Sequence, residues 1–600
     1  VPHTVLKKLL QARPIPKWIG RTILSFMEEW GTRIHLGTDQ GKPHLGPLIR
    51  YKRGVMQGDA LSPVLFCWTI APLSKSIKDL NLGYVTNTGV QVSHLFYVDD
   101  LKLYARSYGS LHKQLNVVGK IVASFGMNLN VRKCAMVTLV EGRSFDSGEN
   151  VFGIPRVGEA ILTYKYLGSP QSIRIEEHKW LMAVESDFVQ TSSAIWRSPL
   201  DLKRKVKAQN QVLTGRLRYV LQILDLSPNK CKRLGILLRK ILKRHRAWNG
   251  NQAIERMTLP NDDGGLGIDE YLTVQKCTKA SVISYMESSN DQMVKEWILP
   301  LLELNTEWCA ERGTKSKWLG WQQLVGNDED GVLHTKIHLK ERARAALITQ
   351  WTRKALHGVQ LSLITGELRH LWLRRGKVDA RTACVIMAAQ DGVTMTREFR
   401  GRIMGKDESQ RCRLCDEPRE TIPHILTMCK VHSWSCYKSR HDEVAWELMR
   451  IISRKILGWK GKWKGAHPTI ISTSRGKIVY DPLVKTRQQI AARRPDLVLE
   501  LKEPNQILLL EIGVCLDKFT ERTWREKFEK YQALANDMAA THQGCEVRVC
   551  PIIVGVLGST DMLEKEIPQI FEKEHESVIE SLQRVALIGT VRTLRTHLAQ

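Results

Sequence analysis

Hydrophobic and polar residues follow different patterns in different parts of the chain. Residues 1–135 alternate short apolar runs with turn-forming residues, which predicts a mixture of helices and strands. Residues 176–260 and 270–400 are predicted to be mostly helical. From about residue 490 the predicted order is strand, strand, long helix, strand, helix, which is an α/β arrangement. No apolar run reaches the roughly 18 residues needed to cross a bilayer, so no membrane partner is expected.

The charge of the chain adds a class of partner to this picture. There are 90 Lys and Arg against 62 Asp and Glu, which gives a net charge of +28. A small soluble domain typically carries a net charge of ~2–8, so this excess favours a polyanion partner, most readily nucleic acid. The 13 cysteines are odd in number and scattered, which excludes a disulfide scaffold and fits a reducing compartment.

Two adjacent acids lie between two apolar, β-prone runs. Residues 95–105 are Leu-Phe-Tyr-Val-Asp-Asp-Leu-Lys-Leu-Tyr-Ala, which predicts Asp99 and Asp100 at the tip of a hairpin. Carboxylates are ligands for Mg²⁺, and two Mg²⁺ about 4 Å apart can activate a 3′-hydroxyl and stabilise a leaving pyrophosphate. Taken alone, the pair fits an ordinary Asp-Asp turn better, and the neighbouring motifs decide between the two interpretations.

Three further segments accompany the acid pair. Residues 53–66 contain Gln-Gly-Asp-Ala-Leu-Ser-Pro, residues 125–134 are Phe-Gly-Met-Asn-Leu-Asn-Val-Arg-Lys-Cys, and residues 164–168 are Tyr-Lys-Tyr-Leu-Gly. In this order, the set resembles the palm of a reverse transcriptase of the non-LTR retrotransposon (LINE) type. The resemblance implies that Asp99 and Asp100 are catalytic and hold Mg²⁺. It implies contacts with template, nucleotide or primer for five more residues: Gln57, Gly58, Tyr166, Leu167 and Gly168.

The family has a further catalytic aspartate, in a segment resembling Asp-x-x-x-Ala-Phe-Asp-x-Val-x-His. Val1-Pro2-His3 resemble the last residues of that segment. We therefore expect the third metal ligand and the fingers to lie before residue 1, and the chain to be a C-terminal fragment. Two carboxylates without the third should bind the metal pair poorly, so we expect little polymerase activity from these 600 residues alone.

The helical segment 176–270 takes the position of the thumb in this resemblance. Its run Lys203-Arg204-Lys205-Val206-Lys207 contains no acid, and Lys203, Arg204 and Lys205 are expected to contact the template–primer backbone. Residues 258–268 are Thr-Leu-Pro-Asn-Asp-Asp-Gly-Gly-Leu-Gly-Ile, which resembles a signature that follows the thumb in these elements. Its two aspartates are predicted to be turn residues.

A second cluster has the spacing of zinc ligands. Cys412, Cys415, His424 and Cys429 form a Cys-x2-Cys-x8-His-x4-Cys pattern whose thiolates and imidazole suit tetrahedral Zn²⁺. His432 and Cys436 are alternative fourth ligands. The short loop predicts a structural zinc knuckle that binds nucleic acid. Residues 371–397 resemble the linker that precedes such a knuckle in the early-branching, site-specific LINE clade.

A third set of residues has the composition of a nuclease site. Asp496 begins one predicted strand, and Glu511 lies inside the next, where an unpaired charge would be costly. Lys527 and Lys530 share one face of the following helix, predicted at about 521–540. Two acids that hold Mg²⁺ and a lysine make up the site of PD-(D/E)xK nucleases. Strict Glu-x-Lys spacing would place the lysine at position 513, which is glycine.

The lysines on the helix resemble the displaced lysine of this LINE clade, in which a restriction-like endonuclease forms the C-terminal domain. Lys518 is the weaker candidate for the same role. The resemblance then covers nearly the whole chain, and the family is that of rDNA-inserting type-1 retrotransposable elements.

The predicted fold is therefore multidomain, α/β plus α. It comprises a partial right-hand reverse transcriptase palm (1–175), a helical thumb (176–270), a helical linker (271–405), a CCHC zinc knuckle (406–440) and a PD-(D/E)xK endonuclease (441–600). The resemblance implies target-primed reverse transcription, in which a nick in double-stranded target DNA primes copying of the element RNA from dNTPs. It also implies Mg²⁺, Zn²⁺ and a nuclear location.

Two alternatives remain open. A group II intron maturase shares the palm, but it would be expected to end in an HNH-type nuclease. A non-catalytic, nucleic-acid-binding remnant of a retroelement is the second, and the missing aspartate favours it for the residues given.

Overall fold

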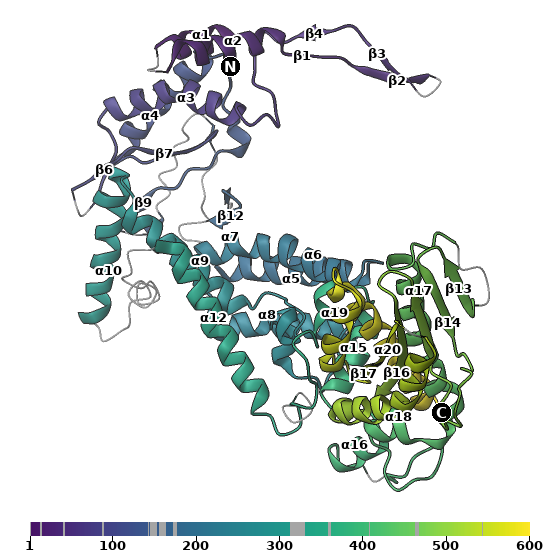
Figure 1. The fold of residues 1–600 in the computed structure, drawn as a ribbon. Helices are drawn as coiled ribbons and strands as arrows, with labels where there is room; N and C mark the ends of the chain where they lie inside the picture. The colour runs from purple at the N-terminus through teal and green to yellow at the C-terminus, as the bar shows by residue number, and fades with distance from the viewer. Residues whose placement is uncertain are drawn as a thin grey trace. The chain divides into compact units, whose positions relative to one another are not determined.

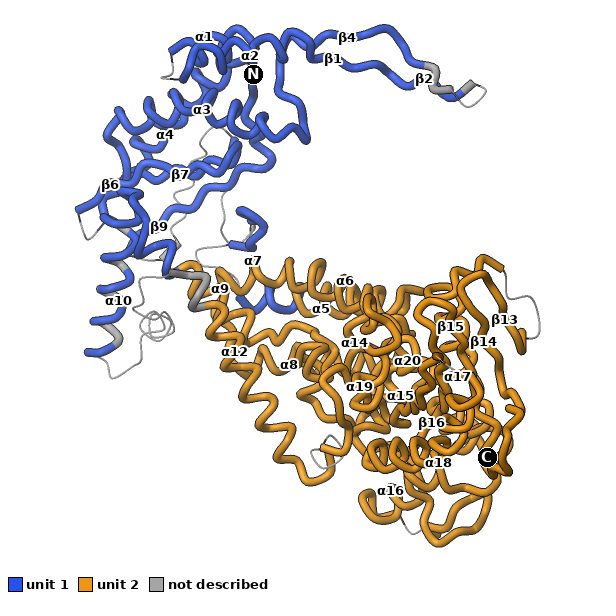
Figure 2. Tube along the Cα trace, viewed as in Figure 1, with its two compact units in different colours: residues 1–183, 283–323 blue, residues 184–282, 324–600 orange. Residues whose placement is uncertain are grey.

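The computed structural model divides into two compact units (Figure 2), residues 1–183 with 283–323 and residues 184–282 with 324–600. The described residues are 2–12, 15–39, 42–86, 89–141, 143–144, 153–154, 164–171, 177–311, 331–357, 362–406, 409–461, 467–542 and 544–600. Among the described helices, none combines the length and the apolar character that crossing a bilayer requires. The predicted domain boundaries are finer than this division and stay predictions.

The first unit mixes helices with short strand pairs, as its sequence pattern predicts. Its longer helices are α1 (His3–Ala12), α2 (Lys17–Glu29), α3 (Ser62–Asp79), α4 (Tyr108–Ser124) and α10 (Leu299–Glu311). Buried apolar residues of α1, α2 and α3 form one core cluster, and a second joins α3 to α4. The strand pairs that matter for function are two antiparallel hairpins, β7 (His94–Tyr97) with β8 (Asp100–Leu103) and β11 (Tyr164–Tyr166) with β12 (Ser169–Gln171).

The second unit begins with a largely helical region, which the sequence also predicts. The helices are α5 (Glu177–Arg197, shared with the first unit), α6 (Leu202–Ala208), α7 (Gly215–Ile223), α8 (Pro228–Arg244), α9 (Tyr271–Ser288), α12 (Gly331–Thr352), α14 (Leu371–Arg375), α15 (Ala380–Gln390) and α16 (Arg397–Arg402). Figure 1 shows them as the teal and green part of the ribbon.

A buried ion pair ties the Gly-Gly-Leu-Gly loop to α15. Arg256 and Asp391 lie 3.1 Å apart, and both side chains are 1% exposed. Arg256 also donates to the Gly264 carbonyl at 2.8 Å. Gly265 has no room for a side chain, because a Cβ there would lie 2.1 Å from the Leu259 carbonyl oxygen. These contacts give the loop a structural role, which agrees with the interpretation of its two aspartates as turn residues.

The C-terminal part of the second unit is built on a five-stranded sheet. Its order is β13 (Ile470–Thr473), β14 (Gly476–Tyr480), β15 (Leu497–Leu501), β16 (Gln506–Cys515) and β17 (Glu546–Gly555). The first four strands pair antiparallel, and β17 pairs parallel with β16. The parallel pair is joined by α18 (Thr520–Thr541), because parallel neighbours need a crossover connection.

Helices cover both faces of this sheet (Figure 1). Alternate residues of β16 point to opposite faces: Leu508, Leu510 and Ile512 pack with α17 (Lys438–Lys455), α19 (Asp561–Ile570) and α20 (His575–Leu598). Ile507 and Leu509 pack on the other face with α18. The strands and the long helix that the pattern after residue 490 predicts are thus present. The helix begins and ends within one residue of the expected positions.

Candidate nuclease, metal and polymerase sites

The two predicted nuclease acids meet at the start of β15, beside the middle of β16. Asp496 immediately precedes β15, and Glu511 is 4% exposed in the middle of β16. The backbone N–H of Asp496 donates to Glu511 Oε2 at 3.2 Å, and the Ile512 N–H donates to Asp496 Oδ2 at 2.8 Å. Antiparallel pairing of Leu497 with Leu510 sets this proximity.

Lys527 reaches Glu511 from helix α18. Its Nζ lies 2.8 Å from Glu511 Oε1, while Lys530 Nζ lies 3.6 Å from the same oxygen. Positions 511 and 513 share the face of β16 that α18 covers. A Cβ at Gly513 would lie 3.3 Å from Lys527 Cε, so the helix lysine occupies the space beside the position that strict Glu-x-Lys spacing would use. Lys518 is exposed, with its Nζ 4.7 Å from the centre of the Phe519 ring.

The surroundings of the two carboxylates shift their pKa values in opposite directions. Burial raises the pKa of Glu511, the charge of Asp496 raises it further, and Lys527 acts in the opposite direction. Burial also opposes ionisation of Asp496, but the hydrogen bond and charge of His441, together with Lys527, hold its pKa below the ordinary value. Two close carboxylates ionise together only when cationic charge is nearby. Their oxygens are hard donors, so this pair fits Mg²⁺.

His441 is a residue of this site that sequence reasoning missed. It lies near the start of α17, and its Nε2 is 3.2 Å from Asp496 Oδ2. Its Nδ1 is 3.1 Å from Asp442 Oδ1. Burial lowers the pKa of His441, but the two carboxylates outweigh this effect and raise the pKa to about 9. The available signal was the run Arg440-His441-Asp442 at the start of an amphipathic helix.

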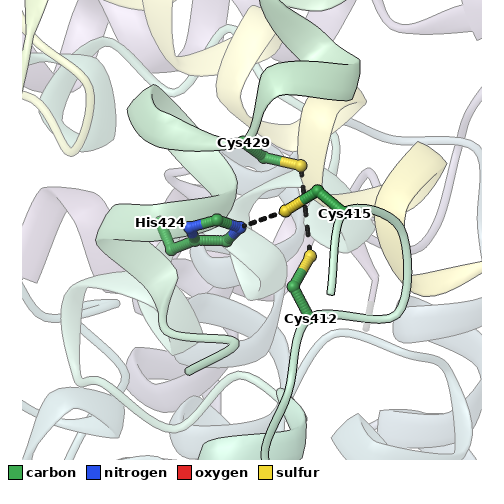
Figure 3. A group of neighbouring side chains, drawn as sticks. All are labelled: Cys412, Cys415, His424 and Cys429. Carbon is green, nitrogen blue, oxygen red and sulfur yellow. Dashed lines mark hydrogen bonds between the residues drawn. The ribbon is translucent and has the colours of Figure 1, made fainter. Parts of the chain in front are cut away.

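The four predicted zinc ligands form one group (Figure 3). All ligand atoms of Cys412, Cys415, His424 and Cys429 lie within 4.8 Å of one another. Cys415 Sγ is 3.3 Å from His424 Nε2, and Cys412 Sγ is 4.0 Å from Cys429 Sγ. Burial and the neighbouring thiols raise the pKa of Cys429, and a bound cation would favour its thiolate form. Three sulfurs and one imidazole fit a tetrahedral Zn²⁺ site.

A buried polar network surrounds this group. His597, near the end of α20, has its Nε2 3.1 Å from Glu420 Oε2 and its Nδ1 2.9 Å from His432 Nε2. Glu420 also accepts from Arg413, at 2.8 Å. His432 thus joins a second possible metal-binding group with Cys429 and His597, whereas Cys436 is in none of the groups found among the described residues. No local pattern points to His597, because it lies in a long helix 177 residues after Glu420.

The polymerase acids lie at a hairpin tip, as predicted. Tyr97 pairs with Asp100, so Val98 and Asp99 form the two-residue turn between β7 and β8. Val98 has a φ of 54°, a left-handed conformation that is unfavourable for a β-branched residue. Asp99 and Asp100 are both exposed. The turn therefore presents two adjacent carboxylates to solvent, where metal and substrate can reach them.

The segment expected to grip the primer lies beside this hairpin. Tyr166 ends β11, and Leu167 and Gly168 form the turn into β12, with φ of 45° and 81°. Lys102 of β8 donates to Gln171 at 3.3 Å and lies 5.0 Å from the centre of the Tyr166 ring. The structure thus brings the two hairpins together.

The motif at residues 53–66 leads into α3. Gln57 and Gly58 are exposed in the turn before this helix, and Gly58 has a φ of 92°, which favours glycine. Helix α3 in turn contacts β7, since Ser74 Oγ lies 2.7 Å from His94 Nε2.

Of the three basic residues expected to contact nucleic acid, Lys205 departs from the prediction. Lys203 and Arg204 are exposed on α6. Lys205 is 8% exposed, and its Nζ donates to the Trp196 carbonyl at 2.8 Å. Because α6 packs with the face that carries Leu202, the residue three positions later is turned inward and away from solvent.

Comparison with known proteins shows which proteins this chain resembles. Residues 1–171 match the family described as "Reverse transcriptase (RNA-dependent DNA polymerase)". The Pol polyprotein of the type-1 retrotransposable element R2 of Nasonia vitripennis is 23% identical over 482 residues, 76% of this chain and 42% of the relative. This chain is similar in sequence to the Pol polyproteins of R2 retrotransposons.

Two more relatives carry the same kind of name. The type-1 R2 Pol polyprotein of Popillia japonica is 24% identical over 308 residues, 48% of this chain and 48% of the relative. The type-2 R2DM Pol polyprotein of Drosophila melanogaster is 23% identical over 474 residues, 74% of this chain and 39% of the relative. The chain therefore spans less than half the length of these curated relatives. All three relatives are named as R2 Pol polyproteins, and none is named as a group II intron maturase.

Proposed function

We propose that this chain supplies two metal-dependent active sites to target-primed reverse transcription. A nuclease site nicks double-stranded target DNA, and a polymerase site extends the freed 3′-hydroxyl with dNTPs along the element RNA. The observation that carries the proposal is the cluster of Asp496, Glu511 and Lys527. These residues are far apart in sequence, and the structure joins them by contacts of 2.8–3.2 Å.

At the nuclease site, Asp496 and Glu511 are the residues that would hold Mg²⁺. A bound Mg²⁺ supplies Lewis-acid stabilisation of the charge that develops on the phosphate. Lys527 directs its ammonium group at the same acids, where it can polarise the attacking water or the scissile phosphate. The sheet and helix arrangement around this cluster supports a PD-(D/E)xK endonuclease domain rather than the HNH-type domain expected of a maturase.

At the polymerase site, Asp99 and Asp100 are the residues that would hold Mg²⁺. The exposed turn between β7 and β8 leaves both carboxylates free to approach a primer terminus and a dNTP. The primer would be supported by Tyr166, Leu167 and Gly168. Their hairpin, β11–β12, is hydrogen-bonded through Lys102 to strand β8, which also carries Asp100. Gln57 and Gly58 would contact template or nucleotide from the turn before α3.

The remaining features serve nucleic-acid binding. The +28 net charge supports a polyanion partner, and the exposed Lys203 and Arg204 are suited to phosphate contacts. The Cys/His group would hold a structural Zn²⁺. Action on chromosomal DNA implies a nuclear location. The conjunction of a built acid–lysine cluster with R2 relatives argues against a non-catalytic remnant.

Nicking of a supercoiled plasmid that carries a ribosomal RNA gene, the insertion site that the resemblance implies, tests the nuclease half. We expect Mg²⁺-dependent conversion to open circles by the parent chain and none by Asp496→Asn. Glu500→Gln is a matched control, since Glu500 lies on the same strand and pairs with Lys477 at the surface. Equal nicking by the parent and Asp496→Asn would refute the assignment.

A further inference from the structure

His441 approaches the nuclease acids from an element that none of the recognised motifs includes. Helix α17 lies on the sheet face opposite α18, so His441 and Lys527 reach the two acids from different layers. His441 Nε2 is 3.2 Å from Asp496 Oδ2 and 3.2 Å from the Ile512 carbonyl oxygen. Its Nδ1 faces Asp442 Oδ1 at 3.1 Å.

The polar atoms around the His441 ring settle its role as a donor. Among the described residues, its hydrogen-bond neighbours are two carboxylate oxygens and one carbonyl oxygen, all acceptors. Both ring nitrogens therefore carry hydrogen when these bonds form. Asp442 holds the Nδ1 side, which fixes the ring so that Nε2–H points at Asp496.

The two donors to Asp496 converge on the same oxygen. The Ile512 N–H reaches Oδ2 at 2.8 Å, and the His441 ring reaches it at 3.2 Å. A carboxylate with one oxygen held by two donors cannot rotate freely. Its other oxygen, Oδ1, is then the one available to a metal ion.

We infer that His441 is a positioning residue for the nuclease metal. It holds the Asp496 carboxylate at Oδ2, which leaves Oδ1 available to the Mg²⁺ that Asp496 would hold, and Asp442 in turn orients His441. This inference rests on the proposed nuclease function, and it assigns His441 no contact with DNA or with the attacking water. Residues that hold metal ligands in this way typically change metal affinity or activity roughly 10–100-fold when they are replaced.

Two near-isosteric substitutions separate the two nitrogens of His441. The amide nitrogen of Gln reaches about as far as Nε2, so His441→Gln keeps a donor for Asp496. The amide nitrogen of Asn reaches only about as far as Nδ1, so His441→Asn keeps the contact with Asp442 and loses the one with Asp496. The full chain carries each substitution, and nicking rate is measured against Mg²⁺ concentration. DNA binding without Mg²⁺ and the thermal unfolding midpoint are recorded for each variant.

The inference predicts that His441→Asn needs roughly 10–100-fold more Mg²⁺ for half-maximal nicking and approaches the parental rate at saturation. DNA binding should be unchanged, and His441→Gln should stay close to the parent. A parental Mg²⁺ dependence in His441→Asn would overturn the inference, as would equal losses in both variants that Mg²⁺ does not restore.

Asp442→Ala keeps the test decisive if His441→Asn does not fold, because it frees the ring and should also raise the Mg²⁺ requirement. An unchanged requirement in that variant contradicts the inference. Asp496→Asn separates failure of the proposed nuclease from failure of the positioning role of His441. If Asp496→Asn nicks normally, the proposed nuclease itself fails. If it is inactive while His441→Asn responds normally to Mg²⁺, only the positioning role fails.

Discussion

Lys527 Nζ lies 2.8 Å from Glu511 Oε1, and Lys527 Cε would lie 3.3 Å from a Cβ at Gly513. A lysine on a helix thus reaches the acid that a lysine two positions along the strand would otherwise reach. Glycine at position 513 leaves the space that the stem of Lys527 uses. Glycine at position 513 and lysine at position 527 therefore belong to one arrangement around Glu511.

Lys527→Ala should lower the nicking rate strongly while sparing DNA binding. One lysine among 90 basic residues contributes little to phosphate attraction, whereas a single preorganised donor at a transition state is worth roughly 10²–10³ in rate. Plasmid nicking and a DNA-binding titration measure the two effects separately. Lys530→Ala is the matched control, since its Nζ is 3.6 Å from Glu511, and it should have the smaller effect.

Adding Gly513→Lys to Lys527→Ala should recover only a small part of the lost rate, because the new lysine starts from the same sheet face but its Cβ would lie 2.5 Å from Ile553 Cδ1, which must shift. If Lys530→Ala is the more damaging variant, the wrong turn of the helix has been chosen. If neither lysine changes the nicking rate, the displaced-lysine interpretation is wrong, and Lys518 is the next residue to test.

Metal analysis should find one zinc per chain. Cys412→Ser and His424→Ala should each lower that content and weaken nucleic-acid binding, because a small loop of this kind depends on its metal to fold. Cys436→Ser serves as control and should leave the zinc in place. Parental stoichiometry in both ligand variants would assign the zinc to other residues, and His432→Ala would then test the neighbouring group.

The buried Arg256–Asp391 pair should dominate the stability of the Gly-Gly-Leu-Gly loop region. Asp391→Ala leaves a guanidinium uncompensated in the core, and loss of one partner of such a pair costs about 3–5 kcal/mol. Arg344→Ala removes the exposed partner of Asp263 and should cost about 0–1 kcal/mol. Denaturant unfolding of the two variants measures the difference. Equal losses in the free energy of unfolding would mean that the buried pair does not stabilise this region more than the exposed pair does.

Strongly patterned elements are predictable from this sequence. The helix expected at about 521–540 is Thr520–Thr541, and the strand expected to contain Glu511 is Gln506–Cys515. Both are long; the strand is a nearly continuous apolar run, and the helix has an apolar face. The acid pair at the β7–β8 turn is equally local, since adjacent residues and a two-residue turn are enough to place it.

Contacts between distant segments are what the pattern could not supply. His441 meets Asp496 across 55 residues, and His597 meets Glu420 across 177. Only tertiary packing brings these pairs together, and neither histidine lies in a spaced motif. The burial of Lys205 was predictable from helix periodicity, because Lys205 shares a helix face with the apolar Leu202.

The central claim is that one chain carries two independent metal-dependent sites, and separation of function tests it most directly. The assay uses the chain joined at its N-terminus to a segment that carries the Asp-x-x-x-Ala-Phe-Asp motif, so that a third carboxylate is present. It measures plasmid nicking and extension of a DNA primer annealed to RNA in the same preparation. The account predicts that Asp496→Ala loses nicking and keeps extension. It predicts that Asp99→Ala or Asp100→Ala loses extension and keeps nicking. Loss of both activities in either single variant, or undiminished extension by Asp99→Ala, would contradict it.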